Sequence, residues 1–138
     1  MLDKNKVRLR IAPIAWTNDD LPDLGRENTF EQCVSEMALA GFTGSEVGNK
    51  YPKDTEVLKK ALELRNIEIC NQWFSSFLLT KSFEEVEKEF RGQLEFLKAL
   101  GARIIGASEQ SYSVQGQENT PVFGKKYVMN DQEWDILC

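Results

Sequence analysis

The sequence predicts an α/β fold built from parallel βα repeats. Four short apolar runs each end in a cluster of polar or aromatic residues, and amphipathic segments lie between the runs. The residues that mark the run ends lie roughly 30 residues apart, the length of one strand, one crossover helix and two loops; they are Trp16, Glu46, Trp73 and Glu109. Because parallel strands open their carboxyl ends on one side of a fold, we expect these residues to converge on one pocket.

The four apolar runs predict four strands. In the last run, the adjacent residues Ile104 and Ile105 indicate a strand that is buried on both faces, as in parallel sheets. The predicted strands are residues 8–16, 42–48, 67–74 and 103–108.

About four helices are predicted from apolar residues that recur every three or four positions and from capping residues. Asp54 caps one helix, and Gly41, Asn66 and Gly101 mark helix ends. The other helices begin at capping boxes, in which Glu or Gln follows the cap by three residues: Thr29 with Gln32, Ser82 with Glu85, and Asn130 with Glu133.

The last predicted helix bears on the domain organisation. The sequence stops about two turns into this helix. The first positions that we expect the helix to bury are Trp134, Leu137 and Cys138. Four parallel strands leave two edges, which proteins cover, close into a barrel or use for association. We therefore expect residues 1–138 to form a single N-terminal half-barrel domain, half of a TIM (β/α)8 barrel. The chain would be a fragment of a longer one, or would pair with a second copy through its exposed edges as a homo-oligomer.

Composition excludes several classes of function. A net charge of −5 and a pI of about 4.9 argue against a surface that neutralises nucleic acid. The apolar stretch near the N terminus is too short for a signal sequence or a membrane span, so we expect no membrane partner and a cytoplasmic location. The three cysteines contain no CxxC pair, and the absence of histidine excludes a Ser-His-Asp triad and histidine metal ligands.

The first three run ends carry candidate binding residues. Trp16 either caps the core or forms one wall of a sugar-sized pocket. Glu46 is an acid in an apolar strand, which is costly unless the side chain faces a wet cavity or pairs with a basic residue of a neighbouring strand. Trp73 and Phe74 are neighbours, so strand alternation sends one ring to each face and one of them should face the pocket.

The fourth run changes abruptly from apolar residues to hydrogen-bonding groups at Ser108, Glu109 and Gln110. A carboxylate at that position can act as a proton shuttle, a hydroxyl acceptor or a metal ligand. The alternative is a solvated loop whose side chains bond their own backbone.

Four segments together resemble the N-terminal half of the myo-inosose-2 dehydratases: residues 11–20, 40–48, 73–76 and 108–116. That family belongs to a sugar isomerase and epimerase group with a xylose-isomerase-like barrel. The resemblance implies a hydro-lyase of inositol catabolism that dehydrates 2-keto-myo-inositol to a trihydroxycyclohexane-dione. It also implies a divalent cobalt or manganese ion and glutathione, with the metal ligands outside this chain.

On this resemblance, we expect Glu109 to be catalytic and four other residues to bind the substrate: Trp16, Glu46, Trp73 and Gln110. We expect no metal ligand in this chain and no activity of the chain alone. Two other hypotheses stay open, a polyol isomerase or epimerase of the same group and a non-catalytic polyol-binding half-barrel that associates with a second copy. An abasic-site endonuclease of the same group fits poorly with the acidic charge and the missing histidines.

Overall fold

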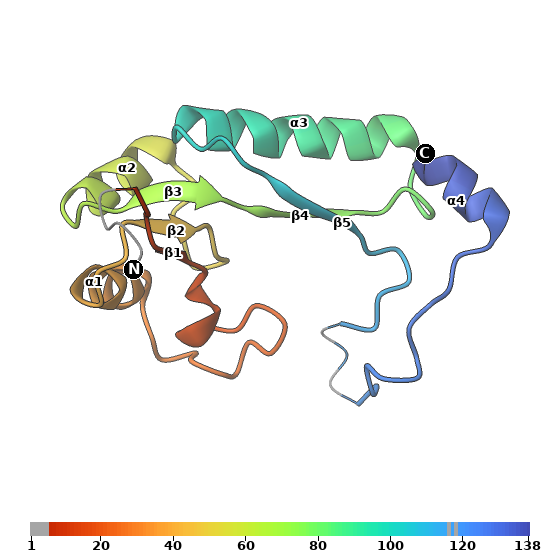
Figure 1. Cartoon of the computed structure of the whole chain (residues 1–138), viewed down its shortest axis with the longest axis horizontal. Helices are drawn as coiled ribbons and strands as arrows, with labels where there is room; N and C mark the ends of the chain where they lie inside the picture. The colour runs from red at the N-terminus through yellow and green to blue at the C-terminus, as the bar shows by residue number, and fades with distance from the viewer. Residues whose placement is uncertain (1–5, 116, 118) are drawn as a thin grey trace.

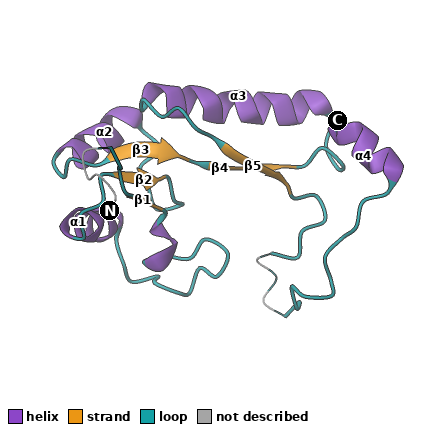
Figure 2. Ribbon diagram, in the orientation of Figure 1, coloured by secondary structure: helices purple, strands orange, loops and turns teal. Residues whose placement is uncertain are grey.

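A computed structural model describes residues 6–115, 117 and 119–138 of the chain. The described residues form five short strands, four α-helices and one 3-10 helix (Figures 1 and 2). The strands are β1 (Arg10–Ile11), β2 (Gly44–Glu46), β3 (Glu68–Asn71), β4 (Trp73–Ser76) and β5 (Gly106–Glu109). The helices are η1 (Pro13–Ala15), α1 (Phe30–Leu39), α2 (Thr55–Glu63), α3 (Phe83–Ala99) and α4 (Asp131–Leu137).

The strands are parallel and follow one another in sequence order. One sheet has the order β1-β2-β3, and a second sheet pairs β4 with β5. Only Gln72 separates β3 from β4, so the chain contains four strand-and-helix units, the arrangement of half a (β/α)8 barrel. In Figure 1, α3 runs along β4 and β5 on one side, and the loop after β5 extends away on the other side.

The predicted third strand, residues 67–74, is observed as two strands rather than one. Its register against β2 shifts, because Ser45 pairs with Ile69 whereas Glu46 pairs with Asn71. Beyond this irregularity the strand exchanges β2 for β5 as its partner, and the Asn71 side chain accepts a hydrogen bond of 2.7 Å from the Gly106 N–H. The bend therefore lies where the strand changes neighbours.

The core lies between the first sheet and its helices. Its fully buried members include Val34 and Met37 of α1 and Leu58 of α2. Ser45 is also fully buried. Its hydroxyl lies 2.6 Å from the Tyr51 hydroxyl within this core, so the buried polar group has a hydrogen-bond partner. Burial raises the pKa of Tyr51 to about 12, so this tyrosine is a neutral part of the packing.

The helix starts agree with the sequence prediction. Thr29 accepts from the Gln32 N–H and Asp54 accepts from two N–H groups of α2. Complete capping boxes open α3 at Ser82 and α4 at Asn130. The box at Thr29 is only half formed, since the Gln32 side chain donates to Glu36 instead.

Three details of the prediction are wrong. The first strand is only β1, because Pro13 has no N–H for a ladder and begins η1 instead. Ile104 is 60% exposed and precedes β5, whose second edge has no neighbouring strand among the described residues. Trp134 is 51% exposed and α4 contains no buried residue, because α4 does not pack on the core.

In the part of the chain that the structure describes, no helix combines the length and the apolar character needed to cross a membrane.

Candidate functional site

Hollows of similar size lie at the two ends of the strands. One, of about 610 Å³, lies at the carboxyl end of β5 and is lined by residues that include Leu79, Glu109, Gln110, Tyr112, Lys126 and Tyr127. We call it the carboxyl-end hollow. The other, of about 620 Å³, lies at the amino end of β3 and is lined by Arg8, Thr43, Glu63, Asn66, Ile67 and Glu68. In βα barrels the ligand binds at the carboxyl ends of the strands, so the first hollow is the candidate site.

Glu109 ends β5, and three hydrogen bonds hold its side chain. Its Oε2 accepts from the Ser76 hydroxyl and the Leu78 N–H, both at 2.9 Å, and its Oε1 accepts from the Ser111 N–H at 2.8 Å. Partial burial acts to raise the pKa of Glu109, but the hydrogen bonds from Ser111, Ser76 and Leu78 outweigh burial and lower it. The carboxylate is therefore ionised at neutral pH.

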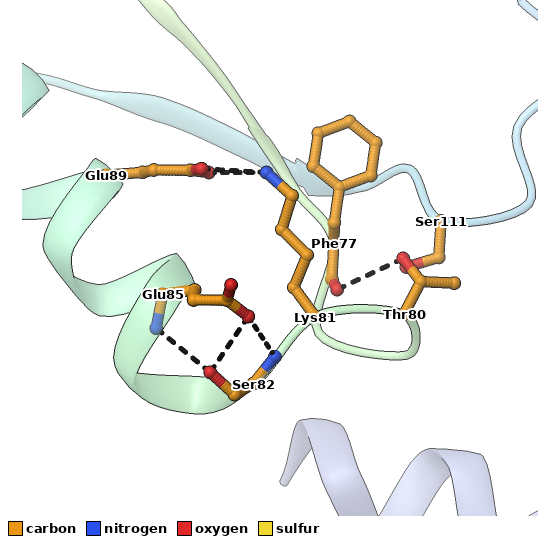
Figure 3. Close-up of polar contacts among 7 residues, drawn as sticks. All are labelled: Phe77, Thr80, Lys81, Ser82, Glu85, Glu89 and Ser111. Carbon is orange, nitrogen blue, oxygen red and sulfur yellow. Dashed lines mark hydrogen bonds and ion pairs between the residues drawn. The ribbon is translucent and has the colours of Figure 1, made fainter.

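Further contacts hold the turn between β4 and α3 (Figure 3). The Thr80 hydroxyl lies 3.2 Å from the Ser111 hydroxyl, which joins this turn to the loop after β5. Lys81 forms an ion pair of 2.7 Å with Glu89 and lies 5.0 Å from the centre of the Phe77 ring. These contacts fix the turn that supplies the Leu78 N–H to Glu109.

Glu109 lies on the helix side of the second sheet. Phe74 packs edge-on against Phe90 of α3, with ring centroids 5.2 Å apart, so its side chain faces the helices. Alternation places Ser76 on the same side, and Ser76 pairs directly with Glu109 and bonds to it. Glu109, which we expected to be catalytic, therefore lies on the same side of the sheet as the buried Phe74. On that side it holds the turn between β4 and α3.

A different set of residues lies on the opposite face. Alternation turns Glu46 away from the helix layer, because the preceding Ser45 is buried within it. The Asn71 amide nitrogen donates to Glu46 Oε2 at 3.1 Å. A Cβ at Gly106 would lie 3.3 Å from both Asn71 Nδ2 and Trp73 Cε3, so these two side chains share that face. We call this side, with Glu46, Asn71, Trp73 and Gln110, the open face.

Gln110 joins the open face to the carboxyl-end hollow. It follows Glu109 and therefore points to the other side of the strand, where its amide donates to the Ser108 hydroxyl at 3.0 Å.

Trp73 is 51% exposed whereas Phe74 is 6% exposed, which confirms the expectation that the two rings face opposite sides. Of the five predicted site residues, Glu109 and Gln110 line the carboxyl-end hollow, whereas Trp16, Glu46 and Trp73 do not.

Trp16 lies apart from the other predicted site residues. It follows η1 rather than a strand, and its indole N–H donates to Glu36 of α1 at 2.6 Å. Hydrogen bonds from Gln32 and Trp16 lower the pKa of Glu36. The sequence prediction placed Trp16 at the end of a strand because it extended the first strand past Pro13. The observed strand β1 ends before Pro13.

The loop that follows Trp16 meets the loop that follows β5. Asp20 accepts a hydrogen bond of 2.6 Å from the Gln115 amide, a contact between residues far apart in the sequence. Lys50 holds the other end of the first loop by donating to the carbonyl oxygens of Gly25, Arg26 and Asn28. These contacts bring the first and last loops to the same side of the structure.

Asn71 is a residue that sequence reasoning missed. Its amide is used at both ends, donating to Glu46 and accepting from the Gly106 N–H. The available signal was the pair of amides, Asn71 and Gln72, at the end of the stretch that contains Ile67, Ile69 and Cys70.

The described residues do not form a metal site by themselves. They contain no group of three or more histidine, cysteine, aspartate or glutamate side chains that could hold an ion. Glu46 and Glu109 lie on opposite faces of the strands, so they do not form the start of such a group. We therefore assign no reaction step in this chain to a metal.

The chain is similar throughout its length to curated inosose dehydratases. The protein of Clostridium perfringens (strain 13 / Type A) is 66% identical over 134 residues, which cover 97% of this chain and 45% of that protein. Those of Clostridium botulinum (strain Alaska E43 / Type E3) and Geobacillus thermodenitrificans (strain NG80-2) are 61% and 59% identical over 100% and 99% of this chain. Each match covers 46% of the relative. No family model matches the chain.

The fold is similar to a solved structure of an AP endonuclease of family 2 from Brucella melitensis. The TM-score is 0.55 at 16% sequence identity, and the match covers 75% of this chain and 41% of the other. At that identity the likeness establishes the fold alone, and it agrees with half of an α/β barrel. The chain spans about half the length of the curated relatives it matches, and along its own length it is inosose dehydratase-like.

Proposed function

We propose that this chain supplies half of an inosose dehydratase, a hydro-lyase that removes water from 2-keto-myo-inositol to give a trihydroxycyclohexane-dione. The observation that carries the proposal is the 59–66% identity to inosose dehydratases along 97–100% of the chain. We place the activity in the cytoplasm and in a complete barrel, whose second half comes from further chain or from a second copy.

The open face offers the chemistry that a polyhydroxylated ring needs. The carboxylate of Glu46 and the amide of Gln110 can bond ring hydroxyls, and the exposed ring of Trp73 can pack on the apolar C–H face of such a ring. Trp16 has its N–H engaged by Glu36, so it offers only its ring surface. We propose that Glu46, Trp73 and Gln110 orient the substrate.

The reaction begins with removal of the proton beside the ketone and continues with loss of the β-hydroxyl, which leaves with a proton as water. Glu109 has a lowered pKa, so at neutral pH it is not a general acid. We propose that the cobalt or manganese ion and the glutathione that the resemblance implies bind through residues outside this chain.

A chimera tests the proposal. The chain would be joined to the portion of the Clostridium perfringens inosose dehydratase that it does not match, and dehydration of 2-keto-myo-inositol would be followed with and without added cobalt or manganese. We expect turnover by the chimera and none by the 138-residue chain alone.

Two results would contradict this account. A folded chimera without turnover would mean that the chain does not supply a functional half, and turnover by the short chain as a monomer would mean that no second half is needed. Native mass measurement of the short chain shows whether an active form is a monomer or a pair.

A further inference from the structure

Two acids mark strand ends in this chain, and the structure gives them unequal surroundings. Glu109 on the helix side accepts from Ser76, Leu78 and Ser111, which occupies three of the about four acceptor positions of a carboxylate. Glu46 is half-buried, and among the described residues the one hydrogen-bond partner of its side chain is Asn71. The carboxylate with free acceptor positions is therefore the one on the open face.

Asn71 is built into the backbone at the point where the two sheets separate. Its oxygen accepts from the Gly106 N–H of β5 at 2.7 Å, and its nitrogen donates to Glu46 of β2 at 3.1 Å. Because the backbone of β5 holds the oxygen of the Asn71 amide, the nitrogen of the same amide also has a defined position. The hydrogen bond from this nitrogen therefore holds the Glu46 carboxylate in one orientation on the open face.

We propose that Glu46 is the carboxylate that contacts the substrate, and that Asn71 is the positioning residue that orients it. This inference rests on the proposed function, since it assumes that the ligand is a polyhydroxylated ring with a ketone. The free oxygen positions of Glu46 accept hydrogen bonds from neighbouring ring hydroxyls, a geometry that suits cyclic polyols. Glu109 then has a different task, which is to hold the turn between β4 and α3.

The chain offers a matched pair of variants for the test. E46Q and E109Q make the same chemical change on opposite faces, and each would be titrated with 2-keto-myo-inositol by calorimetry and melted without ligand. We expect E46Q to raise Kd at least about tenfold with little change in Tm, because it removes a charged hydrogen-bond acceptor from the ligand. We expect E109Q to lower Tm by roughly 5 °C and to change Kd less than about twofold.

The N71A variant separates positioning from general support of the fold. N71A should raise Kd in the wild-type background, but N71A added to E46Q should raise it no further, because Asn71 acts through Glu46. A purely structural Asn71 would instead weaken binding by the same factor in both backgrounds, and that result would overturn its assignment.

The remaining outcomes are distinct. If the wild-type chain binds the keto-polyol and E46Q binds it equally well, the inference is overturned while the proposed function stands. A loss of binding in E109Q without a fall in Tm would also overturn it, because Glu109 would then be the substrate-contacting acid. If the wild-type chain binds no keto-polyol, this inference is overturned, and turnover by the chimera then decides the proposed function separately.

Discussion

At the scale of single residues, the strand-end acids show how the phase of a strand decides the task of a side chain. Glu109 and Gln110 are adjacent, yet the first fastens a turn beneath α3 and the second reaches the open face. The sequence predicts that polar groups gather here, because the change from apolar residues is abrupt. It does not predict which face each side chain takes, since that depends on the register with β4.

The Glu109 hydrogen bonds predict a dependence of stability on pH. The pKa of the folded state lies below the ordinary value of 4.5, so the carboxylate stabilises the fold fully above that value, and the contribution is lost as pH falls through the lowered pKa. We expect E109Q to lower the free energy of unfolding by about 2 kcal/mol at pH 7. The difference from wild type should shrink towards pH 3, as measured by urea unfolding.

A suitable control is E95Q, because Glu95 forms only an exposed ion pair of 3.7 Å with Lys98. Such pairs contribute little, so this variant should match the wild type at every pH. An E109Q difference of the same size at pH 7 and pH 3 would show that ionisation of Glu109 is not what stabilises the turn.

At the scale of elements, capping residues predicted helix starts better than apolar patterns predicted strands. Ser82 and Asn130 form the boxes that their spacing predicts, because a cap depends on only a few neighbouring residues (Figure 3 for Ser82). The prediction of one strand over residues 67–74 was wrong, because the chain bends there as its neighbouring strand changes from β2 to β5. A change of partner strand is a tertiary event with no local signal.

The two capping boxes predict different consequences for stability. α3 buries Val86 and Leu97, the second of them in the core, whereas α4 contains no buried residue. We expect S82A to lower the global free energy of unfolding by about 1 kcal/mol. N130A should leave that value unchanged and speed amide hydrogen exchange only within residues 131–137. Equal losses of global stability in both variants would show that α4 is part of the cooperative core.

At the scale of the whole molecule, the sequence predicted the α/β class and the parallel units, because repeat length and helix phase are local properties. It did not predict that Trp16 would lie beside α1, since Pro13 ends β1 early and turns the chain. It also missed Asn71, whose two partners come from β2 and β5. The open face therefore becomes visible only once the strands are placed side by side.

The central claim is that the carboxyl ends of the strands, rather than the amino ends, bind a keto-polyol. The most direct measurement is a nitrogen-15 NMR titration of the chain with 2-keto-myo-inositol, because the two hollows have similar volumes and separate residues. We expect saturable shifts of the Gln110 side-chain amide, which lines the carboxyl-end hollow, with the side-chain amide of Asn66, which lines the other hollow, unchanged. Shifts at Asn66 with none at Gln110 would contradict the claim.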